Sequence, residues 1–244
     1  MAKDEAENGY ISHLEELRSR IIFSLIFFGI IFIAGLFFID RVSLFLQEPI
    51  KSFQMKLYYF KPYEKFMAYM KVDAVLSLII SIPFVLYQIW AFVRPALEKR
   101  ERNIIGVVVL SVPVIFIGGV AFAFKFIAPA ALKFFVEFSS GDNVVPVWSF
   151  GDYFDMVIGF CVVTGALFQM PLILVAVIAA GIVSVKTVAS YRKYIVILIA
   201  VFAGVFSPGP DIFSQVMIGV PLYLMFEIAL ITGRIVELKR KKDK

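Results

Sequence analysis

Long uncharged apolar runs alternate along the chain with short clusters of charged residues. Six of these runs can be read as separate bilayer-crossing segments: residues 21–39, 74–92, 104–124, 156–182, 194–206 and 212–231. They do not alternate between apolar and polar positions as barrel strands would, and backbone groups inside hydrocarbon must be paired within their own segment. The pattern therefore predicts an all-α integral membrane protein, in which six transmembrane helices form one domain over residues 1–244.

The fifth and sixth runs are predicted to form a short hairpin. The fifth run has 13 residues, which as a helix measure about 20 Å, whereas a hydrocarbon core of about 30 Å needs roughly 20 residues. Pro208, Gly209 and Pro210 stand between the two runs and exclude a continuous helix there. We expect local thinning of the bilayer or a strong helix tilt at this hairpin.

The segment between the first two runs is predicted to cap the helices. It covers 34 residues from Asp40 to Asp73 and contains two prolines, Pro49 and Pro62, among many aromatic residues. Aromatic side chains prefer the membrane interface. Interfacial structure over the end of the bundle is therefore expected here, rather than a disordered loop.

The distribution of positive charge predicts the orientation in the membrane. The segments on the side of the two termini hold 16 lysines and arginines, and those on the other side hold 8. By the positive-inside rule both termini are then cytoplasmic. The composition agrees with a membrane protein, since 61% of residues are apolar and 18% are charged. The pI near 9.2 follows from this topology and does not require a nucleic-acid partner.

Familiar catalytic signatures are absent from the sequence. It lacks the P-loop, the HExxH zinc motif and the GxSxG nucleophile elbow. His13 is the only histidine and Cys161 the only cysteine, which excludes a Ser-His-Asp triad, most zinc sites and an intrachain disulfide. Asp152 and Asp155 share the edge of one predicted helix and have no partner acid in mid-membrane, so an intramembrane aspartyl protease is not favoured. We expect no enzyme activity, no metal and no cofactor.

Two charged clusters border the first two runs. Ser12 and Glu15 fit a capping box at a helix start, and Glu16 can pair with Arg20 one turn later. Glu101 follows the second run and has no basic residue three or four positions away. It is either a solvated carboxylate or available to a guanidinium from another chain.

Two polar side chains lie within apolar runs. Glu227 is in the sixth run, and intramembrane ionisable residues usually face a cavity or the bundle interior. Gln169 lies near the middle of the fourth run, where an interhelical hydrogen bond is about as good an explanation as a functional role. From the residues alone, an ion-coupled secondary transporter that uses Glu227 remains an open alternative.

Several of these clusters also match the motifs of a known family. The match runs from about residue 11 to 234, and its stretches are HLEELR (13–18) with Arg20, EP (48–49), PFVLYQIWAF (83–92), PAL (95–97), ER (101–102), FQMP (168–171), SP (207–208), PDIFSQ (210–215) and FEI (226–228). Together, in this order, they resemble TatC, the multi-spanning subunit of the twin-arginine (Sec-independent) protein translocase.

The resemblance implies a receptor for the twin-arginine signal peptides of folded precursor proteins. Such a receptor nucleates a hetero-oligomeric translocase with single-span TatA/TatB-type subunits, driven by the proton-motive force, among the lipids of the bacterial cell inner membrane. It also implies roles for individual residues: signal-peptide binding for Glu16, Glu101, Phe92 and Arg18, and structural motifs at Pro49, Pro95, Pro210 and Asp211.

Gln169 departs from the commonest pattern of this family, in which many members have glutamate. A glutamine cannot titrate, so it cannot carry a proton at this position. We hypothesise that Gln169 faces a polar concavity accessible to lipid or water and binds there through hydrogen bonds.

Overall fold

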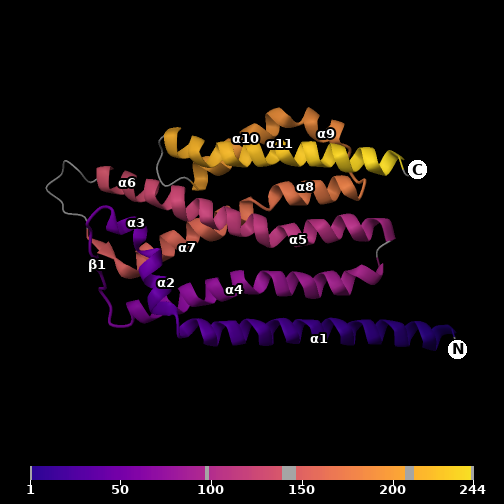
Figure 1. Ribbon diagram of the computed structural model, residues 1–244, viewed down its shortest axis with the longest axis horizontal. Coiled ribbons are helices and arrows are strands. Elements are labelled where there is room, and N and C mark those ends of the chain that lie inside the picture. Colours follow the sequence, from indigo (N-terminus) through magenta and orange to yellow (C-terminus); the bar gives the residue numbers. More distant parts are fainter. Residues whose placement is uncertain (1, 97–98, 139–146, 207–211, 243–244) are drawn as a thin grey trace.

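The computed structural model describes the backbone of residues 2–96, 99–138, 147–206 and 212–242. Its longer helices lie side by side along one axis (Figure 1) and are α1 (Ala2–Leu36), α4 (Glu64–Val93), α5 (Lys99–Phe122), α6 (Ala128–Phe138), α7 (Phe150–Leu167), α8 (Met170–Ala179), α10 (Arg192–Phe206) and α11 (Ile212–Lys242). The shorter elements are α2 (Ile39–Leu46), α3 (Glu48–Lys51), β1 (Leu57–Tyr58), the 3-10 turn η1 (Arg94–Ala96), the π-helical turn η2 (Ala123–Ile127), β2 (Trp148–Ser149) and α9 (Val185–Ser190).

Five helical segments in the described part of the chain are long and apolar enough to cross a bilayer. They are His13–Leu36, Glu64–Val93, Gly106–Phe138, Phe150–Ala179 and Gln215–Leu238. The remaining predicted run forms α10, which has 15 residues and measures about 22 Å, less than the hydrocarbon thickness. α11 has 31 residues, so the predicted hairpin is short in its first helix only.

At several points the helices continue beyond the predicted bilayer-crossing runs. α4 begins at Glu64 rather than at 74, and α11 continues to Lys242 rather than ending at 231. The third run continues past Phe124 through η2 into α6. A charged side chain ends an apolar run but leaves the backbone hydrogen bonds of a helix intact, so a helix can extend beyond the hydrocarbon.

The helix start predicted at Ser12 is wrong. Ser12 lies inside α1, which begins at Ala2, so the predicted capping box does not start a helix. The preceding residues include Ala2, Glu5, Ala6 and Glu7, and alanine and glutamate favour helix formation. The helix therefore extends toward the N-terminus without a break at Ser12.

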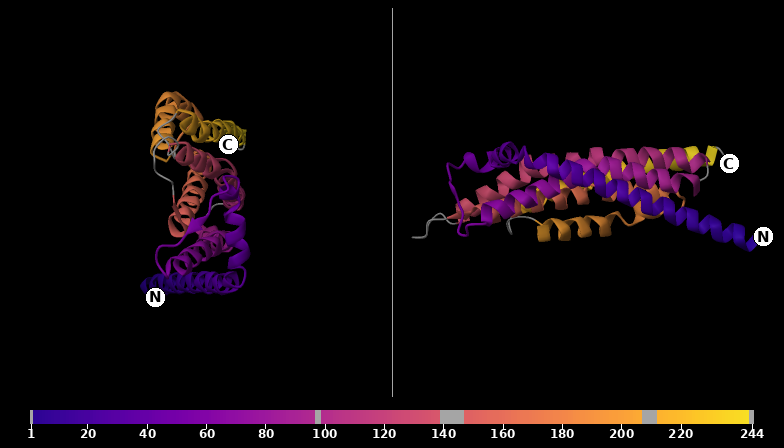
Figure 2. Two further views of the ribbon diagram at one scale, coloured as in Figure 1. Left: turned by 90° about the vertical axis from the view of Figure 1, so that its left-hand side faces the viewer. Right: turned by 90° about the horizontal axis from the view of Figure 1, so that it is seen from below.

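 The helices form an open row rather than a closed bundle, as the end-on view of Figure 2 shows. α1 stands at one edge and packs on α4, while α4 also packs on α5 and α7. α11 packs on α8 and α10 at the other edge. The start of α1 and the end of α11 lie at the same end of the molecule, here called the terminus end (Figure 1). The predicted topology requires this placement.

At the opposite end, here called the cap end, α2, α3 and β1 lie over the long helices, where the sequence predicted a cap. β1 pairs in parallel with β2, which directly precedes α7. Pro49 and Ile50 are buried, and the Tyr153 hydroxyl of α7 donates a hydrogen bond to the carbonyl oxygen of Leu46, 2.6 Å away. Backbone pairing and side-chain contacts therefore both join the cap to α7.

One carboxylate connects the end of the cap segment to the start of α7. Glu64 accepts hydrogen bonds from the backbone N–H groups of Gly151 (2.8 Å) and Phe60 (2.9 Å), and from the hydroxyl of Ser149. Ser149 is also the N-cap of α7, because its Oγ accepts from the N–H of Asp152. Glu64, the first residue of α4, therefore fixes both the segment just before α4 and the first turn of α7.

α5 and α7 approach closely at a pair of glycines. A Cβ atom added to Gly119 would lie 2.9 Å from the Cα of Gly165 and 3.0 Å from the carbonyl oxygen of Thr164. Small residues let helix backbones approach closely in membranes, where van der Waals packing drives helix association. This crossing places α7 in the centre of the fold, and its residues Tyr153, Phe154 and Val157 are fully buried.

Candidate functional site

A polar cluster joins α1 to α4 near the terminus end. Arg20 donates to Oε1 of Glu16 from both Nε (3.0 Å) and Nη2 (2.6 Å). Its Nη1 donates to Oε1 of Gln88 on α4, 3.0 Å away. The predicted Glu16–Arg20 pair is therefore present, and Arg20 extends it to a second helix.

Next to this cluster, an aromatic pair also bridges the two helices. The rings of His13 on α1 and Phe92 on α4 stack with centroids 4.2 Å apart and an interplanar angle of 9°. Nδ1 of His13 lies 3.6 Å from Oε2 of Glu16. Oε2 is the carboxylate oxygen that Arg20 leaves free, so Glu16 presents an acceptor beside a flat ring surface.

The other residues predicted for signal-peptide binding lie at or near the same end. Arg18 is exposed on α1. Glu101 belongs to the first turn of α5, although its side chain is outside the described part of the structure. Pro95, a predicted structural motif, lies in η1 between α4 and α5. Pro210 and Asp211 lie outside the described residues.

Glu227 is paired through both of its carboxylate oxygens. Nη2 of Arg192, the first residue of α10, lies 2.8 Å from its Oε2. The Tyr223 hydroxyl donates to its Oε1 at 2.9 Å. A carboxylate held by a guanidinium and a phenol within one hairpin has an evident role in attaching α10 to α11. The observation that made Glu227 a candidate ion-coupling residue is thereby explained by packing.

Gln169 lies at the break between α7 and α8. Its Nε2 donates to the carbonyl oxygen of Gly165 one turn earlier, 3.2 Å away. Its Oε1 is buried and has no hydrogen-bond partner among the described residues. Pro171 stands two residues later, in the first turn of α8. The side chain thus keeps one unused acceptor at a helix break.

Sequence reasoning missed one buried acid, Asp73. It was assigned to the end of the cap segment, but it lies within α4, is only 2% exposed, and its Oδ2 has no hydrogen-bond partner in the described part of the chain. Its carboxyl group packs over Gly35 of α1, where an added Cβ would lie within 1.9 Å of Oδ1. In the sequence, Asp73 directly precedes a long apolar run, and this position was the signal that could have identified it as a buried acid.

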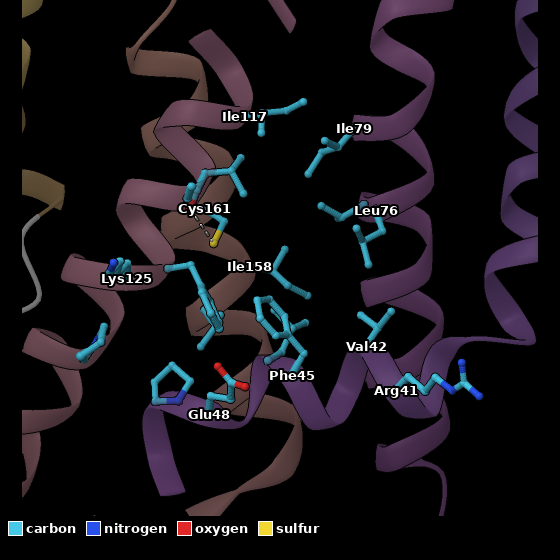
Figure 3. A pocket seen from close by; sticks show the side chains of 18 residues that line it. Arg41, Val42, Phe45, Glu48, Leu76, Ile79, Ile117, Lys125, Ile158 and Cys161 are labelled. Carbon is cyan, nitrogen blue, oxygen red and sulfur yellow. Dashed lines mark hydrogen bonds between the residues drawn. The ribbon is translucent and has the colours of Figure 1, made fainter. Parts of the chain in front are cut away.

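A large cavity opens beneath the cap (Figure 3). Its volume is about 890 Å³, and its walls come from α4, α5 and α7. Val42, Phe45 and Pro49 of α2 and α3 line its cap end, together with Phe124 and Lys125 of η2. Phe45 and Phe124 stack with ring centroids 4.8 Å apart. The only cysteine, Cys161, also lines the cavity.

The family model described as Sec-independent protein translocase protein (TatC) matches residues 12–221. The chain belongs to the TatC family. Its relatives include the TatC protein of Carboxydothermus hydrogenoformans, with 30% identity over 93% of each chain. Another is TatC of Magnetococcus marinus, 34% identical over 96% of this chain and 86% of the relative.

The fold agrees with this family. A crystal structure of the twin arginine translocase receptor TatC in DDM superposes with a TM-score of 0.74 at 32% identity, covering 91% of this chain and 99% of the other. The present TatC-family chain is therefore a multi-pass membrane protein and a component of the twin-arginine protein translocase. The predicted family and the all-helical membrane fold are confirmed.

Replacing Gln169 by leucine is expected to lower export of a twin-arginine reporter protein. The change removes the unused Oε1 acceptor and the Nε2 donor while keeping the volume nearly constant. The measurement is reporter export in cells in which this TatC-family chain is the sole copy. Gln169→Glu, which keeps an acceptor, serves as the matched variant. Unchanged export with leucine would contradict the hypothesis that Gln169 binds through hydrogen bonds.

Proposed function

We propose that this protein is the signal-peptide receptor of a twin-arginine translocase in a bacterial inner membrane. In this proposal the terminus end faces the cytoplasm, as the lysine and arginine distribution predicts. The two adjacent arginines of a cargo signal peptide bind to Glu16 and Glu101. The apolar part of the signal peptide lies along the neighbouring helices within the bilayer.

The observation that carries the proposal is the way Glu16 already holds a guanidinium. Arg20 uses two of its N–H groups on a single oxygen of Glu16. Among the described residues, Oε2 lies near Nδ1 of His13, at 3.6 Å, and accepts no hydrogen bond from Arg20. Charge-assisted hydrogen bonds to a carboxylate are the strongest available to arginine. An incoming arginine can engage Oε2 or take the place of Arg20, which retains Gln88 as a partner.

The aromatic pair beside Glu16 supports recognition of arginine in particular. Phe92 and His13 present stacked rings, and a planar guanidinium stacks on such a surface in addition to binding a carboxylate. A lysine ammonium can satisfy neither the planar stacking nor the bidentate geometry. The site therefore favours arginine over lysine by geometry as well as by charge.

The assembly partners in this proposal are single-span TatA/TatB-type subunits in a hetero-oligomer. The two edges of the open helix row offer them apolar surfaces. On α1, for example, Leu25 and Ile30 are more than half exposed, and on α10 Ile197 and Val201 are too. Apolar helix surfaces of this kind can pack against membrane lipids or against a partner transmembrane helix, because both are apolar.

Signal-peptide binding tests the proposal directly. Binding of an Arg-Arg signal peptide and of its Lys-Lys variant to the purified protein in nanodiscs is measured by fluorescence titration. Glu16→Ala and Glu101→Ala are each expected to weaken binding of the Arg-Arg peptide at least about tenfold, because each removes a charge-assisted partner. Preference for Arg-Arg over Lys-Lys should also be lost.

Glu15→Ala provides the matched control. Glu15 is an exposed acid next to Glu16 on α1, so its removal changes the net charge equally without changing the cluster with Arg20. Wild-type affinity is expected for this variant. If every variant bound both peptides equally well, Glu16 and Glu101 would be ordinary surface residues and the receptor proposal would fail.

A further inference from the structure

The cavity beneath the cap has apolar walls along the membrane and charged groups only at its cap end. Leu76 and Ile79 of α4 face Ile117 and Ile158 across it, as Figure 3 shows. Three charged residues are among its lining: Arg41, Glu48 and Lys125. A ligand that fits must therefore be apolar along most of its length and polar at one end.

Within the described part of the structure, Arg41, Glu48 and Lys125 have neither a hydrogen bond nor an ion pair from their side chains. Glu48 lies at the bottom of the cavity in Figure 3, Lys125 lies at one side, and the guanidinium of Arg41 points away on the other side. The ammonium of Lys125 can therefore bind an anionic group at this rim, and the carboxylate of Glu48 can accept hydrogen bonds from hydroxyl groups.

The helical turn that carries Lys125 has an unusual geometry. η2 is a π-helical turn, and the N–H of Ala128 bonds to the carbonyl oxygen of Ala123 five residues earlier. Pro129 follows, and its ring crowds the carbonyl oxygen of Lys125 four residues before it. π-helical turns are rare and frequently lie at functional sites. Here the turn brings Phe124 and Lys125 to the cavity rim.

The volume favours a lipid chain over a helix. A helix about 10 Å across would fill 890 Å³ within about two turns, and the cap closes the end of the cavity toward which a longer helix would extend. An acyl chain is only one methylene wide and can follow the groove between α4, α5 and α7. Cavities of about 300–1,000 Å³ with apolar walls and a few polar groups are typical of small-molecule sites.

We propose that the cavity beneath the cap is a specific binding site for an anionic glycerophospholipid of the outer leaflet. An acyl chain occupies the apolar groove between α4, α5 and α7. The phosphate group lies at the rim against the ammonium of Lys125, and the headgroup hydroxyls donate to the carboxylate of Glu48. The bound lipid fills the space under the cap and supports its attachment to the helices.

Native mass spectrometry of the purified full chain tests this site. The protein is delipidated in detergent and titrated with palmitoyl-oleoyl phosphatidylglycerol, and the occupancy of the first bound lipid is recorded. Lys125→Ala removes the phosphate partner from an exposed position, and Ala121→Trp fills the groove from an exposed position in α5. Each is expected to weaken binding of the first lipid at least about tenfold.

Lys133→Ala is the matched control. Lys133 is an exposed lysine of α6 that lies 3.7 Å from Glu137 and does not line the cavity, so wild-type occupancy is expected. Palmitoyl-oleoyl glycerol, which lacks the phosphate, should bind at least tenfold more weakly than the phospholipid. Equal binding of the two lipids, or wild-type occupancy in both cavity variants, would overturn the proposal. A further result would also refute it: a synthetic apolar helix displaces the phospholipid, and Lys125→Ala leaves the binding of the phospholipid unchanged.

Discussion

Replacing Gly119 by alanine is expected to lower the stability of the fold by about 1–3 kcal/mol. The new methyl group would lie 2.9 Å from the Cα of Gly165 and 3.0 Å from the carbonyl oxygen of Thr164. Both are backbone atoms of α7, so no side chain can rotate out of the way and the two helices must separate. The measurement is the thermal unfolding temperature of the purified variant in detergent.

The neighbouring glycine provides the control. Gly118 is exposed on α5, and an added Cβ would meet nothing within 4 Å. Alanine also favours a helix over glycine by about 0.5–1 kcal/mol, so Gly118→Ala should keep or raise the unfolding temperature. Equal unfolding temperatures for the two variants would show that the close crossing of α5 and α7 does not limit stability.

Replacing Glu64 by alanine is expected to detach the cap from α7. The N–H groups of Gly151 and Phe60 and the hydroxyl of Ser149 would lose their shared acceptor. Breaking a hydrogen bond on one side only leaves the other partner unsatisfied, which costs more than the bond itself contributed. Limited proteolysis within residues 52–63 should become markedly faster than in the wild type.

Glu137→Ala controls for the loss of a carboxylate at this end of the molecule, since Glu137 is exposed and lies near Lys133 of its own helix. Its proteolysis rate should remain that of the wild type. Glu64→Gln keeps one acceptor oxygen and should be intermediate. Cleavage of the Glu64→Ala protein at the wild-type rate would mean that the pairing of β1 with β2 and the Tyr153 contact hold the cap without Glu64.

The sequence pattern predicted the helical membrane fold, the cap and the short α10 because each depends on local properties of the chain. Uncharged length sets where hydrocarbon can be crossed, and prolines and glycines interrupt helices. The ends of α4 and α11 could not be predicted from the runs, because helices continue into charged sequence outside the hydrocarbon. The glycine crossing of α5 and α7 required knowledge of which helices are neighbours.

The candidate site could likewise be predicted only where its contacts are local in the sequence. Glu16 and Arg20 are four residues apart on one helix, so their pair follows from helix geometry. The partner of Arg20 on α4, Gln88, and the partner of Glu227, Arg192, are 68 and 35 residues away, and local spacing contains no information about them. Asp73 was missed for the same reason, since its burial depends on the approach of α1 at Gly35.

The edge position of α1 has a consequence for biogenesis. Because α1 packs on α4 and the most apolar stretch of its span has no buried residue, it can enter the bilayer during synthesis before the later helices exist. The charge of Arg20 is no obstacle at that stage, since its counter-ion Glu16 belongs to the same helix. The first span can therefore insert with the charge of Arg20 already neutralised by Glu16. The hydrogen bond from Arg20 to Gln88 then forms once α4 has been synthesised and has inserted beside α1.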